Sequence, residues 1–330
     1  MAKPRGIIER LSGEPLPTIR LLDGLTLDHP SRPYPPVQRW RYSAWLRGAA
    51  FLGIAVGAII IVTSIEFGIF LQVRSDSHAF IWFELVGALA GYLIVVLIME
   101  QRRPPLELAP RRALGLVRGL ILGLVLIGLC VGLLAAVGAY RVAGWNGSYN
   151  PWPDLLWVGL VAGVAEELMF RGMLLRLVEE ALGSWGAVAV SAVVFGLLHL
   201  SNADATVWGA VAIAIEAGLL FAAIYLLTRS LWWCIGLHIA WNIAEGPFFG
   251  SVVSGNGAQQ SWIVAAWHGP DILTGGSFGL EASIVPVVLL GALGVALLIY
   301  AQRRGVLVAP AWVRRAKAAQ AAPKTAKVKP

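Results

Sequence analysis

The sequence has few charged residues and only two cysteines. Charged residues make up 14% of its 330 residues and hydrophobic residues 58%, whereas an ordinary soluble domain has roughly 25% charged residues. Mean hydropathy is +0.72. This composition excludes a soluble globular chain and indicates a polytopic membrane protein. The cysteines, Cys130 and Cys234, both lie in apolar segments, so they are expected to be small core residues and no disulfide framework is implied.

Lysine and arginine are absent from the long segment 250–283 and gather elsewhere. Residues 1–48 carry eight of them, and residues 302–330 carry eight more. This alternation follows the positive-inside rule and predicts that both termini are cytoplasmic. The net charge of +7 therefore needs no nucleic-acid partner. The basic tails are expected to lie against anionic lipid headgroups.

No apolar run begins before residue 49, so a cleaved signal peptide is not expected. We predict an all-α fold, a polytopic membrane helix bundle of about eight transmembrane helices. Its domains are a basic cytoplasmic tail over 1–48, partly disordered or interfacial, the bundle over 49–301, and a second basic cytoplasmic tail over 302–330. The expected spans are 49–72, 79–99, 116–139, 154–177, 185–200, 205–228, 231–248 and 282–301.

Two adjacent carboxylates and an arginine lie inside an apolar span, in the stretch AEELMFRG at 165–172. A charge at the centre of a membrane helix costs about 2.5 to 3.5 kcal/mol on insertion scales. On a helix, residues four apart share a face, so Glu167 and Arg171 can form an ion pair. Glu166 lies about 100° further round the helix, and one arginine fully neutralises only one carboxylate.

Two further helices carry compact polar patches with the same spacing. FGLLH places Phe195 and His199 on one face, and HIAWN does the same for His238 and Asn242. Taken singly, each of these residues fits an interhelical hydrogen bond, and the Glu–Arg pair fits a structural ion pair. Polar patches in a membrane bundle turn toward each other or toward a water-filled cavity. Their conjunction on three helices therefore favours a catalytic site.

These side chains suit hydrolysis by an activated water within the membrane. Glu166 can act as a general base. Alternatively, Glu166, His199 and His238 can hold a divalent metal such as zinc and leave one position for water. Asn242 and a histidine can donate hydrogen bonds to an oxyanion. Neither a serine nor a cysteine stands beside a histidine in these patches, and the HExxH motif is absent.

The three motifs EELMFR (166–171), FGLLH (195–199) and HIAWN (238–242) occur in this order. They resemble the EExxxR, FxxxH and HxxxN motifs of the CAAX-protease and bacteriocin-processing (CPBP, or Abi) family of intramembrane proteases, which includes type II CAAX prenyl endopeptidase. The resemblance covers about residues 153–248. It implies an eight-helix bundle with a conical polar cavity. It also implies roles: Glu166 activates water with His199 beside it, His238 and Asn242 stabilise the oxyanion, and Glu167, Arg171 and Phe195 organise the site.

The expected function is that of an intramembrane endopeptidase acting on a membrane-associated or lipidated, CAAX-like protein or peptide. The predicted topology places His199 toward the outer side, which fits poorly with a cytosol-facing CAAX activity. We therefore expect a bacterial cell-membrane protein with a different peptide substrate. The alternatives are a transporter or ion-coupled carrier that uses Glu66, Glu84 and Glu216, and a pseudoprotease that sequesters membrane partners. No inverted repeat supports the carrier.

Overall fold

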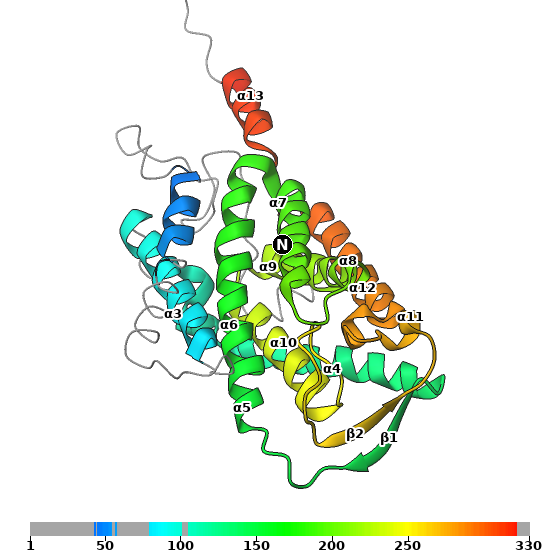
Figure 1. Cartoon of the computed structure of the whole chain (residues 1–330). Helices are drawn as coiled ribbons and strands as arrows, with labels where there is room; N and C mark the ends of the chain where they lie inside the picture. The colour runs from blue at the N-terminus through cyan, green and yellow to red at the C-terminus, as the bar shows by residue number, and fades with distance from the viewer. Residues whose placement is uncertain (1–42, 44, 55–56, 58–78, 101–104, 322–330) are drawn as a thin grey trace, which may run out of the picture.

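The computed structural model describes residues 43, 45–54, 57, 79–100 and 105–321. Most of the predicted first span and of the N-terminal tail, and the end of the C-terminal tail, lie outside the described residues. Within them the fold is almost entirely helical, with one two-stranded sheet (Figure 1). The predicted all-α class is confirmed.

The described residues contain fewer candidate membrane spans than the sequence predicts. In the described part of the chain, four helical runs are long and apolar enough to cross a membrane: Pro110–Ala136, Trp152–Ser201, Val207–Thr228 and Ile284–Arg303. Two shorter apolar helices cover Trp45–Ile54 and Leu85–Met99. The predicted eight spans are thus not confirmed. One reason is that the predicted fourth and fifth spans belong to a single helical run of 50 residues.

The first half of the described chain forms the outer helices and the helix that carries the glutamates. After the helix Trp45–Ile54 come α3 (Ala79–Leu93), η2 (Ile94–Met99), η3 (Leu106–Leu108), η4 (Pro110–Arg112), α4 (Leu114–Ala136), β1 (Tyr140–Trp145), α5 (Trp152–Asp154), η5 (Leu155–Val161), α6 (Ala162–Glu167), η6 (Leu168–Leu175) and α7 (Arg176–Leu198). The elements η2, η5 and η6 are π-helical continuations of their neighbours.

The second half supplies the remaining helices and the second strand. Its elements are η7 (His199–Ser201), α8 (Val207–Ile213), η8 (Ala214–Gly218), α9 (Leu219–Thr228), α10 (Leu231–Ile243), η9 (Ala244–Phe248), β2 (Ile263–Trp267), α11 (Asp271–Thr274), η10 (Leu280–Ala282), α12 (Ile284–Arg303) and α13 (Ala311–Ala321).

Helices α4 and α10 cross at very short distance because glycines face the contact. A Cβ on Gly119 would lie 2.2 Å from the carbonyl oxygen of Trp233. A Cβ on Gly236 would lie 2.1 Å from the carbonyl oxygen of Leu116. Without side chains at these points the two backbones touch, which is how membrane helices gain packing contacts. The crossing fixes α10, the helix that carries the predicted polar patch of His238 and Asn242.

Helix α6 packs against another side of α10, again through a glycine. A Cβ on Gly163 would lie 2.9 Å from Cγ1 of Ile239. Ile239 directly follows His238, and Gly163 lies one turn before Glu167. This contact therefore brings the glutamates of α6 beside the histidine of α10.

The long helical run from Trp152 to Ser201 is broken at Gly183, which has φ 74° and ψ 176°. This backbone conformation favours glycine. The C-terminal segment packs against the break: the Ser184 amide donates to the Val308 carbonyl oxygen at 2.9 Å, and the Val308 amide donates to Ser184 Oγ at 2.7 Å. The predicted link between the fourth and fifth spans is therefore helix with a turn at one residue.

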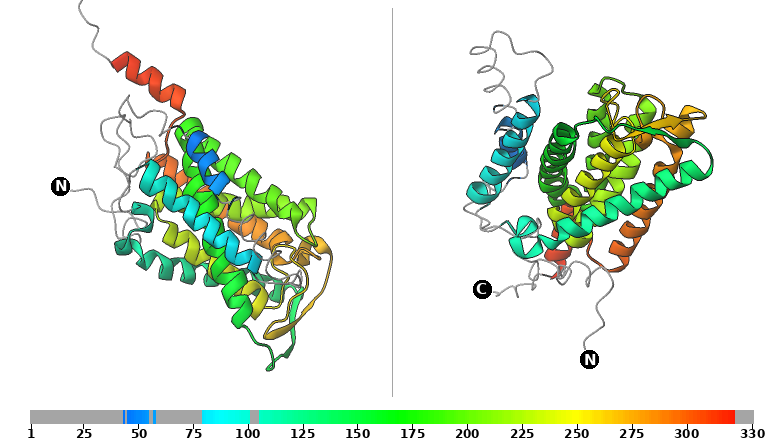
Figure 2. Two further views of the ribbon diagram at one scale, coloured as in Figure 1. Left: turned by 60° about the vertical axis from the view of Figure 1, so that its left-hand side comes forward. Right: turned by 90° about the horizontal axis from the view of Figure 1, so that it is seen from below.

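A small antiparallel ribbon of β1 and β2 lies at the opposite end of the bundle from α13, as Figures 1 and 2 both show. The register pairs Tyr140 with Trp267 and Trp145 with Ile263. Both strands come from links that the charge pattern assigns to the outer side. This ribbon was not predicted from the sequence.

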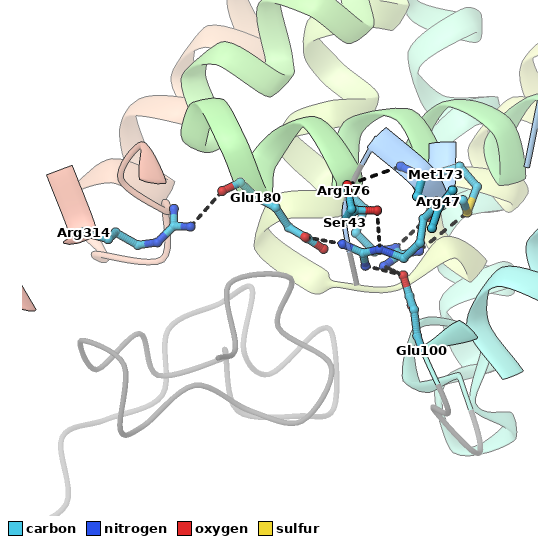
Figure 3. A network of polar contacts seen from close by, with 9 residues as sticks. Ser43, Arg47, Glu100, Met173, Arg176, Glu180 and Arg314 are labelled. Atoms are coloured by element: carbon cyan, nitrogen blue, oxygen red, sulfur yellow. Dashed lines mark hydrogen bonds and ion pairs between the residues drawn. The ribbon is translucent and has the colours of Figure 1, made fainter. Parts of the chain in front are cut away.

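A buried network of ion pairs lies near α13 (Figure 3). Arg47 Nη1 is 2.6 Å from Glu100 Oε1, and Arg176 Nη1 is 2.7 Å from the same oxygen. Arg47 also pairs with Glu180, whose carbonyl oxygen accepts a hydrogen bond from Arg314 at 2.8 Å. The network joins helix Trp45–Ile54, the end of η2, α7 and α13.

Candidate active site

The two adjacent glutamates end helix α6 and have different environments. Glu167 is completely buried, whereas the Glu166 side chain is 22% exposed. Arg171 Nη1 donates to Glu167 Oε1 at 2.9 Å, and Arg171 Nη2 donates to the Ala217 carbonyl oxygen at 3.1 Å. The ion pair expected from the four-residue spacing is therefore present, and it involves Glu167.

His238 lies between the two carboxylates. Its Nδ1 is 3.0 Å from Glu167 Oε1, and its Nε2 is 3.9 Å from Glu166 Oε2. A carboxylate that already accepts from Arg171 also accepts from the imidazole, so Nδ1 carries a proton and Nε2 faces Glu166. Among the described residues, Glu166 Oε2 has no hydrogen-bond partner. One glutamate thus orients the histidine, and the other keeps an oxygen available.

His199 is held by the first residue of its own motif. Its Nδ1 is 2.7 Å from the Phe195 carbonyl oxygen. A carbonyl oxygen only accepts hydrogen bonds, so Nδ1 donates and Nε2 is left for other contacts. The Phe195 ring lies 4.7 Å from the imidazole and 5.0 Å from Cζ of Arg171, measured from its centroid. Phe195 therefore contacts both the predicted histidine and the predicted arginine.

Asn242 lies one turn after His238 and is almost buried. Its Nδ2 donates to the Val158 carbonyl oxygen at 2.9 Å. An amide nitrogen has two hydrogens, so one N–H remains for another acceptor.

Four of the predicted site residues line one cavity, and Glu166 does not. One cavity is lined by residues from α7, η7 and α10 that the sequence analysis had named: Phe195, His199, His238 and Asn242. Glu166 is not among the lining residues, although its carboxylate lies 3.9 Å from His238. No hydrogen bond or ion pair within the described residues joins Glu166 to His199.

Acidic residues that were not among the predicted site residues line the cavity or lie beside it. Glu216 from η8 and Glu281 from η10 line it, and Glu245 on η9 is buried nearby. Glu245 lies seven residues after His238, so helical periodicity offered a signal for it. Glu281 follows a segment without periodicity and offered none.

Of the three glutamates considered for an ion path, the structure describes the side chain of Glu216 alone. Glu216 reaches the cavity. Glu66 lies outside the described residues, and the structure describes the helix at Glu84 but not its side chain.

The residues described by the structure contain no group of three or more histidine, cysteine, aspartate or glutamate side chains placed to hold a metal ion. In this structure Glu166, His199 and His238 do not form such a group, and the zinc site considered from the sequence stays a prediction. No step through a metal follows from this geometry.

Residues 148–244 match a family model described as Type II CAAX prenyl endopeptidase Rce1-like. This stretch contains all three motifs, so the resemblance noted from the sequence is confirmed. No curated protein matches the chain, and no solved structure matches it. The match covers less than half of the chain, and with the long apolar helices it indicates an integral membrane protein with an Rce1-like segment.

Proposed function

We propose that the protein is an intramembrane endopeptidase in which Glu166 activates the attacking water. The observation that supports this most is the position of His238. Its ring is held by Glu167 on one side and faces the available oxygen of Glu166 on the other. The same ring shares a cavity with His199 and Asn242. A general base, an oriented imidazole and an amide donor are the groups that peptide hydrolysis requires.

In the proposed reaction, Glu166 takes a proton from water while the water oxygen bonds to the carbonyl carbon of the peptide. The carbonyl π electrons move to oxygen, and the remaining N–H of Asn242 donates to this oxyanion. His238 acts as an imidazolium held between the two carboxylates, and its Nε2 donates a second hydrogen bond to the same oxyanion. The C–N bond then breaks, and Glu166 returns its proton to the leaving amine. His199 accepts a hydrogen bond from the water through Nε2.

The proposed substrate is a membrane-associated peptide or protein. The name of the matching family refers to prenylated CAAX sequences. A lipidated peptide is therefore one of the substrates to be tested. We further propose that both termini are cytoplasmic and that the cavity opens on the side of the β1–β2 ribbon. In that orientation an outer-side peptide is a better candidate than a cytosolic CAAX protein.

The test uses the full chain in lipid nanodiscs. A farnesylated CAAX peptide, its unprenylated form and a library of membrane-spanning peptides are incubated with the protein, and products are identified by mass spectrometry. We expect wild-type protein and the control Glu107→Gln to cleave at least one of these, and Glu166→Gln to cleave none at a comparable rate. Glu107 is also a buried glutamate but lies on η3, outside the cavity lining.

Two results would contradict the proposal. Cleavage of the same peptide at equal rates by wild type and Glu166→Gln would exclude Glu166 as the base. Binding of a peptide without any cleavage by wild type would favour the sequestering pseudoprotease or a carrier.

A further inference from the structure

Three glutamates outside the family motifs are buried at or beside the cavity. Glu216, Glu245 and Glu281 are 1%, 0% and 4% exposed. Glu216 and Glu281 line the cavity together with His199 and His238. Oε2 of Glu216 has no hydrogen-bond partner among the described residues. A buried, ionised carboxylate oxygen in this state is strongly unfavourable unless a proton, a water or a ligand satisfies it.

Glu216 has two other buried carboxylates, Glu245 and Glu281, in its surroundings. Glu216 interacts electrostatically with both Glu281 and Glu245, and each of these interactions is between like charges. Glu281 Oε2 accepts a hydrogen bond from Ser254 at 2.7 Å, and Glu245 Oε1 lies 3.5 Å from Ser251 Oγ. Hydroxyl donors reduce the repulsion but do not neutralise charge.

Within the residues that the structure describes, no lysine or arginine forms an ion pair with this cluster. Between Arg171 and Arg303 the sequence contains only Arg176 and Arg229 as basic residues besides histidine. Arg176 pairs with Glu100, and Arg229 pairs with Glu179. Arg171 pairs with Glu167. In the described part of the chain, none of the three cavity glutamates forms an ion pair with lysine or arginine.

The remaining walls of the cavity suit a hydrocarbon chain. Ile213, Phe221 and Leu290 line it beside the glutamates. Lysine and arginine place an aliphatic stem against apolar surface and a charged head at its end. The combination of apolar walls and carboxylates without a lysine or arginine partner therefore matches the side chain of a lysine or arginine, and the described residues contain no three-ligand group for a metal ion.

We propose that Glu216 and Glu281 form a subsite for a lysine or arginine side chain of the peptide substrate, next to the bond that is cleaved. This inference rests on the proposed endopeptidase function, since the same cavity contains His199, His238 and Asn242. The subsite selects substrates by charge at one position relative to the cleaved bond.

The first experiment measures cleavage specificity with the full chain in nanodiscs. Peptides carry lysine, arginine, or the uncharged analogues norleucine and citrulline at each position around the cleaved bond. Loss of one partner of a buried charge pair typically reduces binding on the order of 30-fold or more. We expect wild type to prefer the basic residue by about that factor in kcat/KM, at one fixed position. Glu216→Gln should bring the preference close to one, and the control Glu107→Gln should keep it.

The second experiment measures binding without cleavage. Thermal unfolding of the purified protein is followed with n-butylguanidinium and with the uncharged analogue n-butylurea. We expect a saturable rise in the unfolding temperature of wild type and of Glu107→Gln with the guanidinium compound only. Glu216→Gln and Glu281→Gln should show no such rise.

The outcomes separate this proposal from the proposed function. Cleavage without preference for basic residues, and without guanidinium binding, overturns the subsite but leaves the endopeptidase intact. Guanidinium binding that depends on Glu216, without cleavage of any peptide, overturns the endopeptidase and supports the cationic subsite. An equal fall in kcat for lysine and norleucine peptides in Glu216→Gln assigns Glu216 to proton transfer and contradicts the subsite. If that variant fails to fold, wild-type preference and binding still decide.

Discussion

At the scale of single residues, the glutamate doublet divides into two tasks. Glu167 is buried, accepts from Arg171 and holds His238. Glu166 is partly exposed and faces Nε2 of the same histidine. The four-residue spacing was sufficient to predict which glutamate pairs with Arg171. It was not sufficient to predict that His238, rather than His199, lies between the carboxylates, because that depends on how α6 and α10 cross.

Removing Arg171 tests this division. Arg171→Ala leaves Glu167 as a buried charge without its arginine, a change that typically costs 3–5 kcal/mol. It also removes a cation from between the rings of Phe195 and Phe221, whose centroids lie 5.0 and 4.8 Å from Cζ. We expect a lower unfolding temperature and a lower folded yield in detergent. Glu166→Gln should unfold close to wild type, and equal unfolding temperatures for the two variants would contradict the assigned pairing.

At the scale of elements, the site depends on how closely the helices approach. The glycines of α4 allow the backbone of α10 to touch it, and Gly163 allows α6 to approach the residue after His238. Any increase in these separations moves His238 away from the glutamates. Packing at glycines therefore positions the site without contributing a polar group to it.

Adding a single methyl group to α4 tests the crossing. Gly119→Ala places a Cβ 2.2 Å from the Trp233 carbonyl oxygen, so the helices must separate. Overpacking of this kind typically destabilises by about 1–3 kcal/mol. Gly128→Ala on the same helix is the matched control, because its Cβ meets nothing within 4 Å and alanine favours helix. A thermal unfolding scan should show a loss for Gly119→Ala only, and similar curves for both would contradict the close crossing.

The elements that the sequence predicted are those whose signals are local. The helices with the three motifs carry polar residues at helical spacing, and the structure places those residues on helices or directly after them. The turn at Gly183 was not predicted, because it is one residue within a helical sequence. The β1–β2 ribbon was not predicted either, since its strands are more than 100 residues apart in the chain and their pairing depends on the fold of the whole bundle.

The same reasoning explains which cavity residues were missed. Glu281 lies on the short 3₁₀ element η10, which follows β2 and α11 in the long connection between η9 and α12. Its position at the cavity depends on contacts of that segment, such as the hydrogen bond from the Leu280 amide to Ser251 Oγ at 2.8 Å. A sequence pattern contains no information on such a return of the chain.

At the scale of the whole molecule, the bundle has two different ends. One carries the buried ion-pair network of Arg47, Glu100 and Arg176 near α13, and the other carries the β1–β2 ribbon (Figures 1 and 3). Helix α13, which belongs to the basic C-terminal segment, lies at the first end. This arrangement is consistent with the proposed orientation, in which the first end faces the cytoplasm.

Cysteine labelling in intact cells tests the orientation. The native cysteines, Cys130 and Cys234, are both buried, so background labelling should be low. Ala258→Cys and Lys317→Cys introduce cysteines at exposed positions near the ribbon and on α13. An impermeant maleimide should label position 258 directly and position 317 only after permeabilisation. The opposite result would reverse the orientation.

The central claim is that Glu166 activates the water, and the most direct test is a single-turnover measurement on Glu166→Gln in nanodiscs. Glutamine keeps the shape of the side chain but cannot take the proton. General base catalysis typically contributes 10²- to 10⁴-fold, so the cleavage rate at saturating enzyme should fall by about that factor, while the Kd for the same peptide stays within about twofold of wild type. A cleavage rate close to that of wild type, at unchanged Kd, would contradict the account.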